Sequence, residues 1–284
     1  MFTIRLFTEA DIPAGMHLKR TAGWNQTEAD WRRAVALQPD GCYAGLCDGN
    51  VVATLSTCVF GPVAWIAMVL TDPAYRGRGF ASRLLERALA DLRERRVESV
   101  RLDATDLGRP VYEKFGFTVD FELQRWDGVV AAIDRDDLPP DILLREARGD
   151  DLSAVAELDR QTSGCDRGRL LALLQTDASC PGLVAECAGV PWGFALQRSG
   201  EHATQIGPLA AANETIAQSL LRHSFHRSSG MRTFVDVKSG SLGIDPLLRC
   251  AGLGVQRRFL RMTLGRKLTD LGTSSWVSSG PEKG

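Results

Sequence analysis

The sequence predicts a mixed α/β protein in which a largely antiparallel sheet is flanked by helices, with this unit built twice in tandem. Short β-patterned runs alternate with amphipathic helical patterns along the first half of the chain. A Gly49-Asn50 pair between two such runs is typical of a β-hairpin. The second half resembles the first in the order and spacing of its residues, which indicates a duplication.

The expected elements of the first copy are a strand, two helices, three strands, a helix, a strand, a short helix and a final strand. A stripe of apolar side chains with charged residues opposite justifies the long helix. The ranges, in that order, are 3–7, 11–19, 27–37, 41–47, 51–59, 64–70, 79–95, 99–104, 109–115 and 117–126.

The duplication is clearest where Arg5 and Asp11 recur as Arg145 and Asp151, each 140 residues later. Near the ends of the two copies the matching offset is 136. The two copies are separated by DRDDLPPD, a polar run whose paired prolines resist both helix and sheet. The predicted domains are residues 1–134 and 141–268, followed by a Gly/Ser-rich tail over 269–284.

Composition excludes several classes of protein. The 284 residues are 44% hydrophobic, 24% charged and carry a net charge of -1, which gives no sign of a nucleic-acid or membrane partner. The seven cysteines are odd in number and form no C-x-x-C pair, so reduced thiols fit better than disulfides or zinc. Neither a signal peptide nor a membrane span is visible, and a cytoplasmic protein is expected.

The run Arg76-Gly77-Arg78-Gly79 stands where a strand gives way to the helix over 79–95. Backbone N–H groups at a helix start lack partners within the helix and attract anions, and glycine lets a phosphate approach them. The arginines add positive charge. An ordinary surface turn is the alternative that these residues leave open.

Two stretches resemble the GNAT acetyltransferase superfamily. RGRGFA, Arg76 to Ala81, fits its R/Q-x-x-G-x-G/A signature, and VYEKFGF, Val111 to Phe117, resembles its later motif. The resemblance covers residues 1–130, and the whole chain resembles a tandem GNAT protein whose second half is degenerate.

The resemblance implies an N-acetyltransferase that passes an acetyl group directly from acetyl-CoA to an amine, with no metal. Tyr112 would be the general acid that protonates the leaving thiolate. Many family members have an asparagine where this chain has Thr105, which would still contact the pantetheine arm. The implied cofactor-binding residues are Val69, Leu70, Thr71, Arg76, Gly77, Arg78, Gly79, Phe80, Ala81 and Thr105.

In the family the loop between the first two helices borders the acceptor. Trp24 in that loop could cover a cation, and Glu28 could attract one. Against this, Thr27 reads as a helix N-cap with Asp30 as its third residue, and Trp31 reads as core.

A base must deprotonate the amine, and Asp103 is a candidate that could equally cap a loop. We expect a small cationic amine as the acceptor. His202, His223 and His226 lack accompanying ligands at useful spacing, so no metal site is expected.

The second copy has lost the site. At an offset of 136, Arg76 to Gly79 align with Ala212 to Thr215, and Tyr112 aligns with Leu248. Both positive charges are gone, and Glu214 would repel a pyrophosphate. We expect this half to bind no acetyl-CoA. We also expect it to pack against the first half as an internal pseudo-dimer and to form part of the wall of the acceptor site. Such an arrangement is compatible with a monomeric protein. The alternatives are a non-catalytic acyl-CoA sensor or interaction module, and a purely structural pair.

Overall fold

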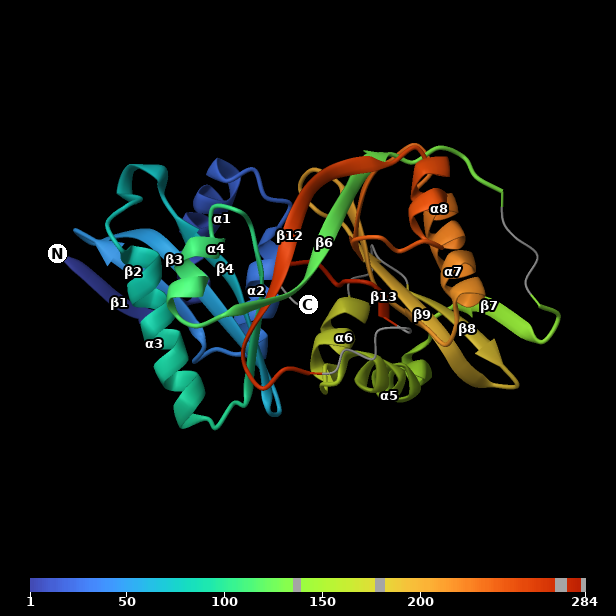
Figure 1. The fold of residues 1–284 in the computed structure, drawn as a ribbon, viewed down its shortest axis with the longest axis horizontal. Helices are drawn as coiled ribbons and strands as arrows, with labels where there is room; N and C mark the ends of the chain where they lie inside the picture. Colours follow the sequence, from blue (N-terminus) through green and yellow to red (C-terminus); the bar gives the residue numbers. More distant parts are fainter. Residues whose placement is uncertain (135–138, 177–181, 269–274, 282–284) are drawn as a thin grey trace. The chain divides into compact units, whose positions relative to one another are not determined.

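The computed structural model describes residues 1–134, 139–176, 182–268 and 275–281. The chain divides into two compact units, each with the predicted helices and largely antiparallel sheet (Figure 1). Unit 1 contains Met1–Thr118, Met262–Lys267 and Pro281. Unit 2 contains Val119–Arg261 and the described part of Leu268–Gly280.

Unit 1 has strand order β1-β2-β3-β4-β5, and the end of β12 follows β5. Its hairpin turns at Asp48 and Gly49, one residue earlier than predicted, because Cys47 pairs with Asn50. The bounds are β1 Phe2–Leu6, η1 Glu9–Asp11, α1 Ile12–Thr21, α2 Glu28–Leu37, β2 Cys42–Cys47, β3 Asn50–Phe60, β4 Val63–Thr71, η2 Pro73–Tyr75, α3 Phe80–Glu94, β5 Ser99–Ala104 and α4 Arg109–Lys114.

Helices cover both faces of this sheet. Phe2 stacks on Phe80 of α3 with ring centroids 3.9 Å apart. Phe7, an odd number of residues further along the same extended chain, points the other way and stacks on Trp31 of α2 at 4.9 Å. The predicted apolar stripe of α3 is buried against the sheet, including Leu84 and Leu85.

Unit 2 has strand order β7-β8-β9-β10-β11-β6-β12, and β13 pairs with β10. The bounds are β6 Thr118–Val129, β7 Ile142–Glu146, η3 Gly149–Asp151, α5 Leu152–Ser163, α6 Gly168–Gln175, β8 Leu183–Cys187, β9 Val190–Arg198, β10 Thr204–Ala211, α7 Glu214–Arg227, β11 Arg232–Lys238, α8 Asp245–Cys250, β12 Gly254–Gly265 and β13 Ser275–Val277.

The compact units do not coincide with the two copies seen in the sequence, because almost all of β6 lies in unit 2 and the end of β12 lies in unit 1. β6 follows the first copy in sequence, yet it pairs with β11 from Arg232↔Val129 to Lys238↔Leu123 in unit 2. The end of β12, Met262–Gly265, lies in unit 1, where the next residue, Arg266, donates its backbone N–H to Glu98 O at 2.8 Å. The predicted boundary at 134–141 includes residues outside the described ranges and stays a prediction.

Repeated residues make repeated contacts. Arg5 forms an ion pair with Asp11 at 2.6 Å, and Arg145 forms the same pair with Asp151 at 2.7 Å. Each aspartate also accepts the backbone N–H three residues before it, from Thr8 and from Arg148. The shared motif therefore ties the first strand of each copy to the start of its first helix.

The tail expected over 269–284 is partly ordered structure. Residues 269–274 and 282–284 lie outside the described residues, but Ser275–Val277 form β13, and Val277 is only 1% exposed. Trp276, whose docking the sequence left open, donates its indole N–H to Ala211 O at 3.2 Å.

Two general expectations can be compared with the described residues. The six described cysteines are free thiols, and Cys180 lies outside the described ranges. None of the described helices has the length and apolar character needed to cross a membrane.

The exchanged strand β6 is held by a buried ion pair. Arg125 in β6 donates to both carboxylate oxygens of Asp236 in β11, at 2.8 and 2.7 Å, and both residues are at least 95% buried. We expect Asp236→Ala to lower the free energy of unfolding of unit 2 by about 3–5 kcal/mol, because it removes the carboxylate that balances the charge of a buried guanidinium. Urea denaturation measures this.

The matched control is Arg232→Ala. It breaks an ion pair with Asp127 between the same two strands, but the arginine side chain is 48% exposed. This control should cost less than about 1 kcal/mol. Equal losses in the two variants would contradict a special role for the buried pair.

Candidate functional site

The central strands of unit 1 separate partway along their length. β4 and β5 are parallel and pair at Val63↔Ser99, Ala64↔Val100 and Trp65↔Arg101. Within the described residues their pairing ends there, although β4 continues to Thr71 and β5 to Ala104. The backbone of Val69–Thr71 therefore presents an edge that β5 does not cover.

A bulge in β4 shapes this edge. Thr54 pairs with Leu70 while Ser56 pairs with Ala67, so β4 has one extra residue. Met68 takes a φ of +51°, and its carbonyl accepts a hydrogen bond of 2.8 Å from Thr54 Oγ1. Such a bulge bends a strand and re-aims its neighbours. The sequence analysis missed it, because neither Met68 nor Thr54 carries a bulge signal.

The signature loop follows β4 directly. Asp72 Oδ1 accepts the N–H of Ala74 at 2.8 Å and so starts the short turn η2. Gly77 and Gly79 both have φ of +76°, a left-handed conformation that favours glycine. A Cβ at either position would meet no atom within 4 Å. The glycines thus serve the backbone path, and the space beside them is open to a ligand.

The loop carries two arginines without a carboxylate partner in the described part of the chain. Arg76 and Arg78 are exposed. Arg76 Nε donates to Thr71 O at 3.3 Å, and the guanidinium of Arg78 lies 5.0 Å from the ring centroid of Tyr75. Positive charge that no carboxylate of the described ranges neutralises is thereby held at the start of α3, where the helix dipole also favours an anion.

The equivalent helix start in unit 2 is capped by a side chain. Gly79, the N-cap of α3, has no side chain with which to cap the helix. In α7 the N-cap is Asn213, whose Oδ1 accepts the N–H of Ile216 at 3.0 Å, and Glu214 lies in the first turn. One of the helix's own donors is already used, and the added charge is negative.

Tyr112 lies in α4 and is 8% exposed. Its ring meets Phe117 edge to face, with centroids 5.9 Å apart. Burial raises the pKa of the Tyr112 phenol, so the group is a neutral proton donor at neutral pH.

Thr105 links β5 to α4. Its carbonyl accepts the N–H groups of Gly108 and Arg109 at 3.0 and 2.9 Å, and its Oγ1 also accepts the N–H of Gly108 at 3.3 Å. The hydroxyl oxygen thus helps to start the helix that carries Tyr112. A contact from its O–H to the pantetheine arm stays a prediction.

Among the residues of the α1–α2 loop, Thr27 and Asp30 form the predicted capping box, and Trp31 is core, 2% exposed. Glu28 is exposed and pairs with Arg32 at 2.9 Å. Trp24 is half-buried.

The sequence analysis overlooked Lys19. This lysine is fully buried in α1, and its Nζ donates to Trp24 O at 3.2 Å. It holds the loop that carries Trp24. A lysine in an amphipathic helix is normally expected to be exposed. The role of Lys19 becomes clear only from its hydrogen bond to the loop that follows α1.

Asp103 is half-buried near the end of β5 and has an interaction partner in the structure. The strand registers make Asp103 the counterpart of Asp236. In unit 1 Trp65 pairs with Arg101, and Asp103 lies two residues after Arg101. In unit 2 Gln205 pairs with Phe234, and Asp236 lies two residues after Phe234. Since Asp236 is bound in an ion pair, the repeat favours a structural carboxylate at Asp103 over a free base.

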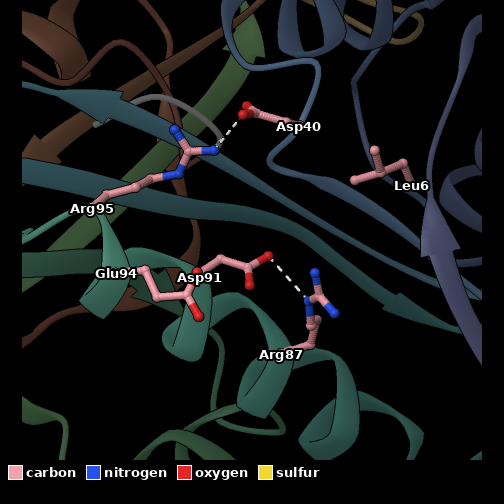
Figure 2. Close-up of a pocket in the computed structure, with 6 residues that line it drawn as sticks. All are labelled: Leu6, Asp40, Arg87, Asp91, Glu94 and Arg95. Carbon is pink, nitrogen blue, oxygen red and sulfur yellow. Dashed lines mark hydrogen bonds and ion pairs between the residues drawn. The ribbon is translucent and has the colours of Figure 1, made fainter.

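A hollow of about 360 Å³ lies in unit 1, near the end of α3 that is farther from the signature loop. Figure 2 shows the residues that line it. Arg95 pairs with Asp40 there, and Arg87 pairs with Asp91 at 3.1 Å. The arginines are neutralised and Glu94 adds negative charge, so the hollow does not suit a pyrophosphate. It is lined by Leu6, Asp40, Arg87, Asp91, Glu94 and Arg95.

Within the described residues, no group of three or more His, Cys, Asp or Glu side chains is arranged so that it could hold a metal ion. His223 Nδ1 lies 2.9 Å from Ser219 O, one turn earlier in α7.

Comparison with known proteins finds the same family in both halves. Residues 8–117 match a model described as the acetyltransferase (GNAT) family, and residues 155–274 match one described as an acetyltransferase (GNAT) domain. The uncharacterized N-acetyltransferase YitH of Bacillus subtilis is 25% identical over 193 residues. That match spans 67% of this chain and 66% of the relative, just under two thirds of its length.

Solved structures share the fold. A protein from Pyrococcus horikoshii, assigned as an acetyltransferase, has a TM-score of 0.86 at 23% identity and covers 100% of this chain and 96% of its own. A GCN5-related N-acetyltransferase from Sphaerobacter thermophilus has a TM-score of 0.68 at 19% identity, covering 96% and 98%. A tandem GNAT protein from the clavulanic acid biosynthesis pathway has a TM-score of 0.64 at 12% identity, covering 95% and 100%.

The buried phenol of Tyr112 predicts a pH effect on stability. An unfolded tyrosine ionises near pH 10, and burial raises the pKa of Tyr112 above that value. Its contribution to stability is therefore complete below about pH 10 and is lost as the pH rises towards the folded pKa. Between about pH 10 and 11 the wild-type protein should lose stability more steeply than Tyr112→Phe. Urea denaturation across this range measures the slopes, and parallel slopes would contradict the burial of an ionisable phenol.

Proposed function

Since the chain belongs to the GNAT acetyltransferase family, with one copy of the domain in each half, we propose that unit 1 binds acetyl-CoA and transfers its acetyl group to a primary amine. The family membership agrees with the resemblance seen in the sequence. The observation that carries the proposal is the start of α3. There an uncapped helix N-terminus, two glycines at positive φ and two arginines without carboxylate partners among the described residues come together.

In the proposed complex the pyrophosphate lies against Arg76 to Ala81. The backbone N–H groups of the first turn of α3 donate to it, and Arg76 and Arg78 balance its charge. The pantetheine arm lies along Val69–Thr71, where its amides pair with the strand edge that β5 leaves uncovered. Thr105 is proposed to bind this arm from the β5 side.

The proposed reaction is a direct transfer. The amine nitrogen attacks the thioester carbonyl, a C–N bond forms, and the C–S bond breaks with the electron pair leaving on sulfur. Tyr112 donates its phenolic hydrogen to the developing thiolate. The proton lost by the attacking nitrogen passes to solvent or to a base, and the phenol is restored from solvent.

We propose a small cationic amine as the acceptor. Trp24 supports this assignment, because a half-buried indole in the α1–α2 loop can contact a cation. Glu28 could contribute only by leaving its surface pair with Arg32. We propose a cytoplasmic enzyme, in keeping with the free thiols of the six described cysteines. A pseudo-dimer of the two copies is also part of the proposal.

The signature loop is tested by charge reversal. Arg76→Glu, which copies the sign of Glu214 in unit 2, should weaken acetyl-CoA binding at least a hundredfold, since it places like charge beside the pyrophosphate. Calorimetric titration measures the affinity. The control is Arg93→Glu, the same change at an exposed position near the other end of α3. Equal affinity in the two variants would refute the pyrophosphate site.

The acid role is tested by Tyr112→Phe, which keeps the ring and removes the donor. Acetyl-CoA affinity should stay within about threefold, while kcat for a screened amine acceptor should fall about 10²–10⁴-fold. Thiol release measures turnover. An unchanged kcat would remove Tyr112 from the chemistry. Acetyl-CoA binding with no turnover on any amine would instead support the acyl-CoA sensor.

A further inference from the structure

The cleft of unit 2 that corresponds to the proposed pantetheine site is filled by the chain's own C-terminal strand. β10 and β11 are parallel and pair only at Thr204↔Thr233, Gln205↔Phe234 and Ile206↔Val235 in the described residues. β10 then continues to Ala211, as β4 continues past its last pairing with β5. β13 lies along this part of β10.

The strand registers show that β13 uses the same positions that unit 1 offers to a cofactor. Thr57 pairs with Ile66 in unit 1, and Gln197 pairs with Ile206 in unit 2, so equivalent residues differ by 140 (197 − 57 and 206 − 66). The same offset holds further along, where Ala53↔Thr71 corresponds to Gly193↔Ala211.

β13 pairs at Leu209↔Val277 and Ala210↔Ser275. Subtracting 140 from Leu209 and Ala210 gives Val69 and Leu70, which are proposed to pair with pantetheine. The polypeptide of β13 thus supplies backbone amides to the edge that a pantetheine amide would otherwise use.

The groove fits this strand along both sides. Ser278 N–H donates to Asp236 O in β11 at 2.9 Å, and Trp276 Nε1 donates to Ala211 O in β10 at 3.2 Å. Ser278 O approaches Gly207 so closely that a Cβ there would lie 2.0 Å from it.

Side chains of neighbouring strands complete the groove. Arg198 donates to Ser279 O at 2.9 Å, and both residues are buried. Val277 belongs to the buried apolar cluster of unit 2 together with Ile206 and Leu209. A main chain satisfied on both edges and an anchored valine are the marks of strand addition to a sheet.

We propose that unit 2 is a strand-binding module whose ligand is the C-terminal segment Ser275–Gly280, held in the groove of a lost cofactor site and in place of a cofactor. The segment supplies hydrogen-bond partners to the separated strands β10 and β11, and Val277 packs within the apolar cluster. The side chain of Asn213 already binds one N–H group of the helix start where a phosphate would otherwise lie. The peptide segment therefore fills the groove without a phosphate.

The test removes the segment and returns it in trans. A chain ending at residue 274 should bind a fluorescein-labelled peptide with the sequence of residues 275–284, measured by fluorescence anisotropy. The same peptide should raise the unfolding temperature of the truncated chain. The full-length protein is the control and should bind the peptide at least tenfold more weakly, because its groove is already filled.

Two control peptides define the specificity. A scrambled peptide should not bind, and a peptide with Val277→Asp should bind at least tenfold more weakly, since it brings a carboxylate into the apolar cluster. A folded truncated chain that binds no peptide, or that binds the scrambled peptide equally well, would overturn the proposal.

If the truncated chain does not fold, a protease site placed within residues 269–274 gives the same test on the folded protein. After cleavage the segment should stay bound during gel filtration and exchange slowly with labelled peptide. Immediate loss of the segment with an unchanged unfolding temperature would overturn the proposal. Peptide binding does not depend on acetyl-CoA binding in unit 1, so this test is independent of the proposed function.

Discussion

The separation of two parallel strands is the constraint on which the rest of this structure depends. Buried backbone N–H and C=O groups must be hydrogen-bonded, so an edge opened in the middle of a sheet requires a partner from elsewhere. Both copies open this edge, after Trp65 in β4 and after Ile206 in β10. In unit 2 the partner is the chain itself, and in unit 1 it is proposed to be the cofactor. The same separation of strands is thus proposed to bind a cofactor in one copy, and it holds β13 in the other.

The start of the following helix divides the copies in the same way. α3 begins at a glycine, so no N-cap side chain binds its first N–H groups, and Arg76 and Arg78 lie beside them. α7 begins at Asn213, which uses one of those donors, and continues with an acidic residue. Unit 2 lacks the signature sequence of the first copy, and β13 pairs with its strand β10. These are two separate features. Each on its own would disfavour a bound acyl-CoA, the first by charge and capping, the second by occupancy.

Much of this could be read from the sequence. The order of elements, the duplicated Arg–Asp motif, the capping box at Thr27 and the glycine-rich helix start all depend on contacts between residues close in the chain. The exchange of β6 and β12 could not be predicted, because a strand has the same alternating pattern whichever sheet it joins. The bulge at Met68 follows from tertiary contacts of ordinary residues. β13 was read as part of a tail because Trp276 and Val277 stand alone within a Gly/Ser-rich run. The position of this segment depends on the groove, where Gly207 allows the close approach of Ser278 and Arg198 donates to Ser279 O.

Unit 1 is proposed to bind acetyl-CoA, whereas β13 occupies the corresponding cleft of unit 2. The stoichiometry of acetyl-CoA binding tests this difference most directly. Calorimetric titration of the full chain with acetyl-CoA should give one site per chain. No binding would mean that the Arg76 loop is only a helix start and that unit 1 lacks the proposed activity. Two sites would mean that β13 does not close the second cleft, and the distinction drawn between the two copies would be wrong.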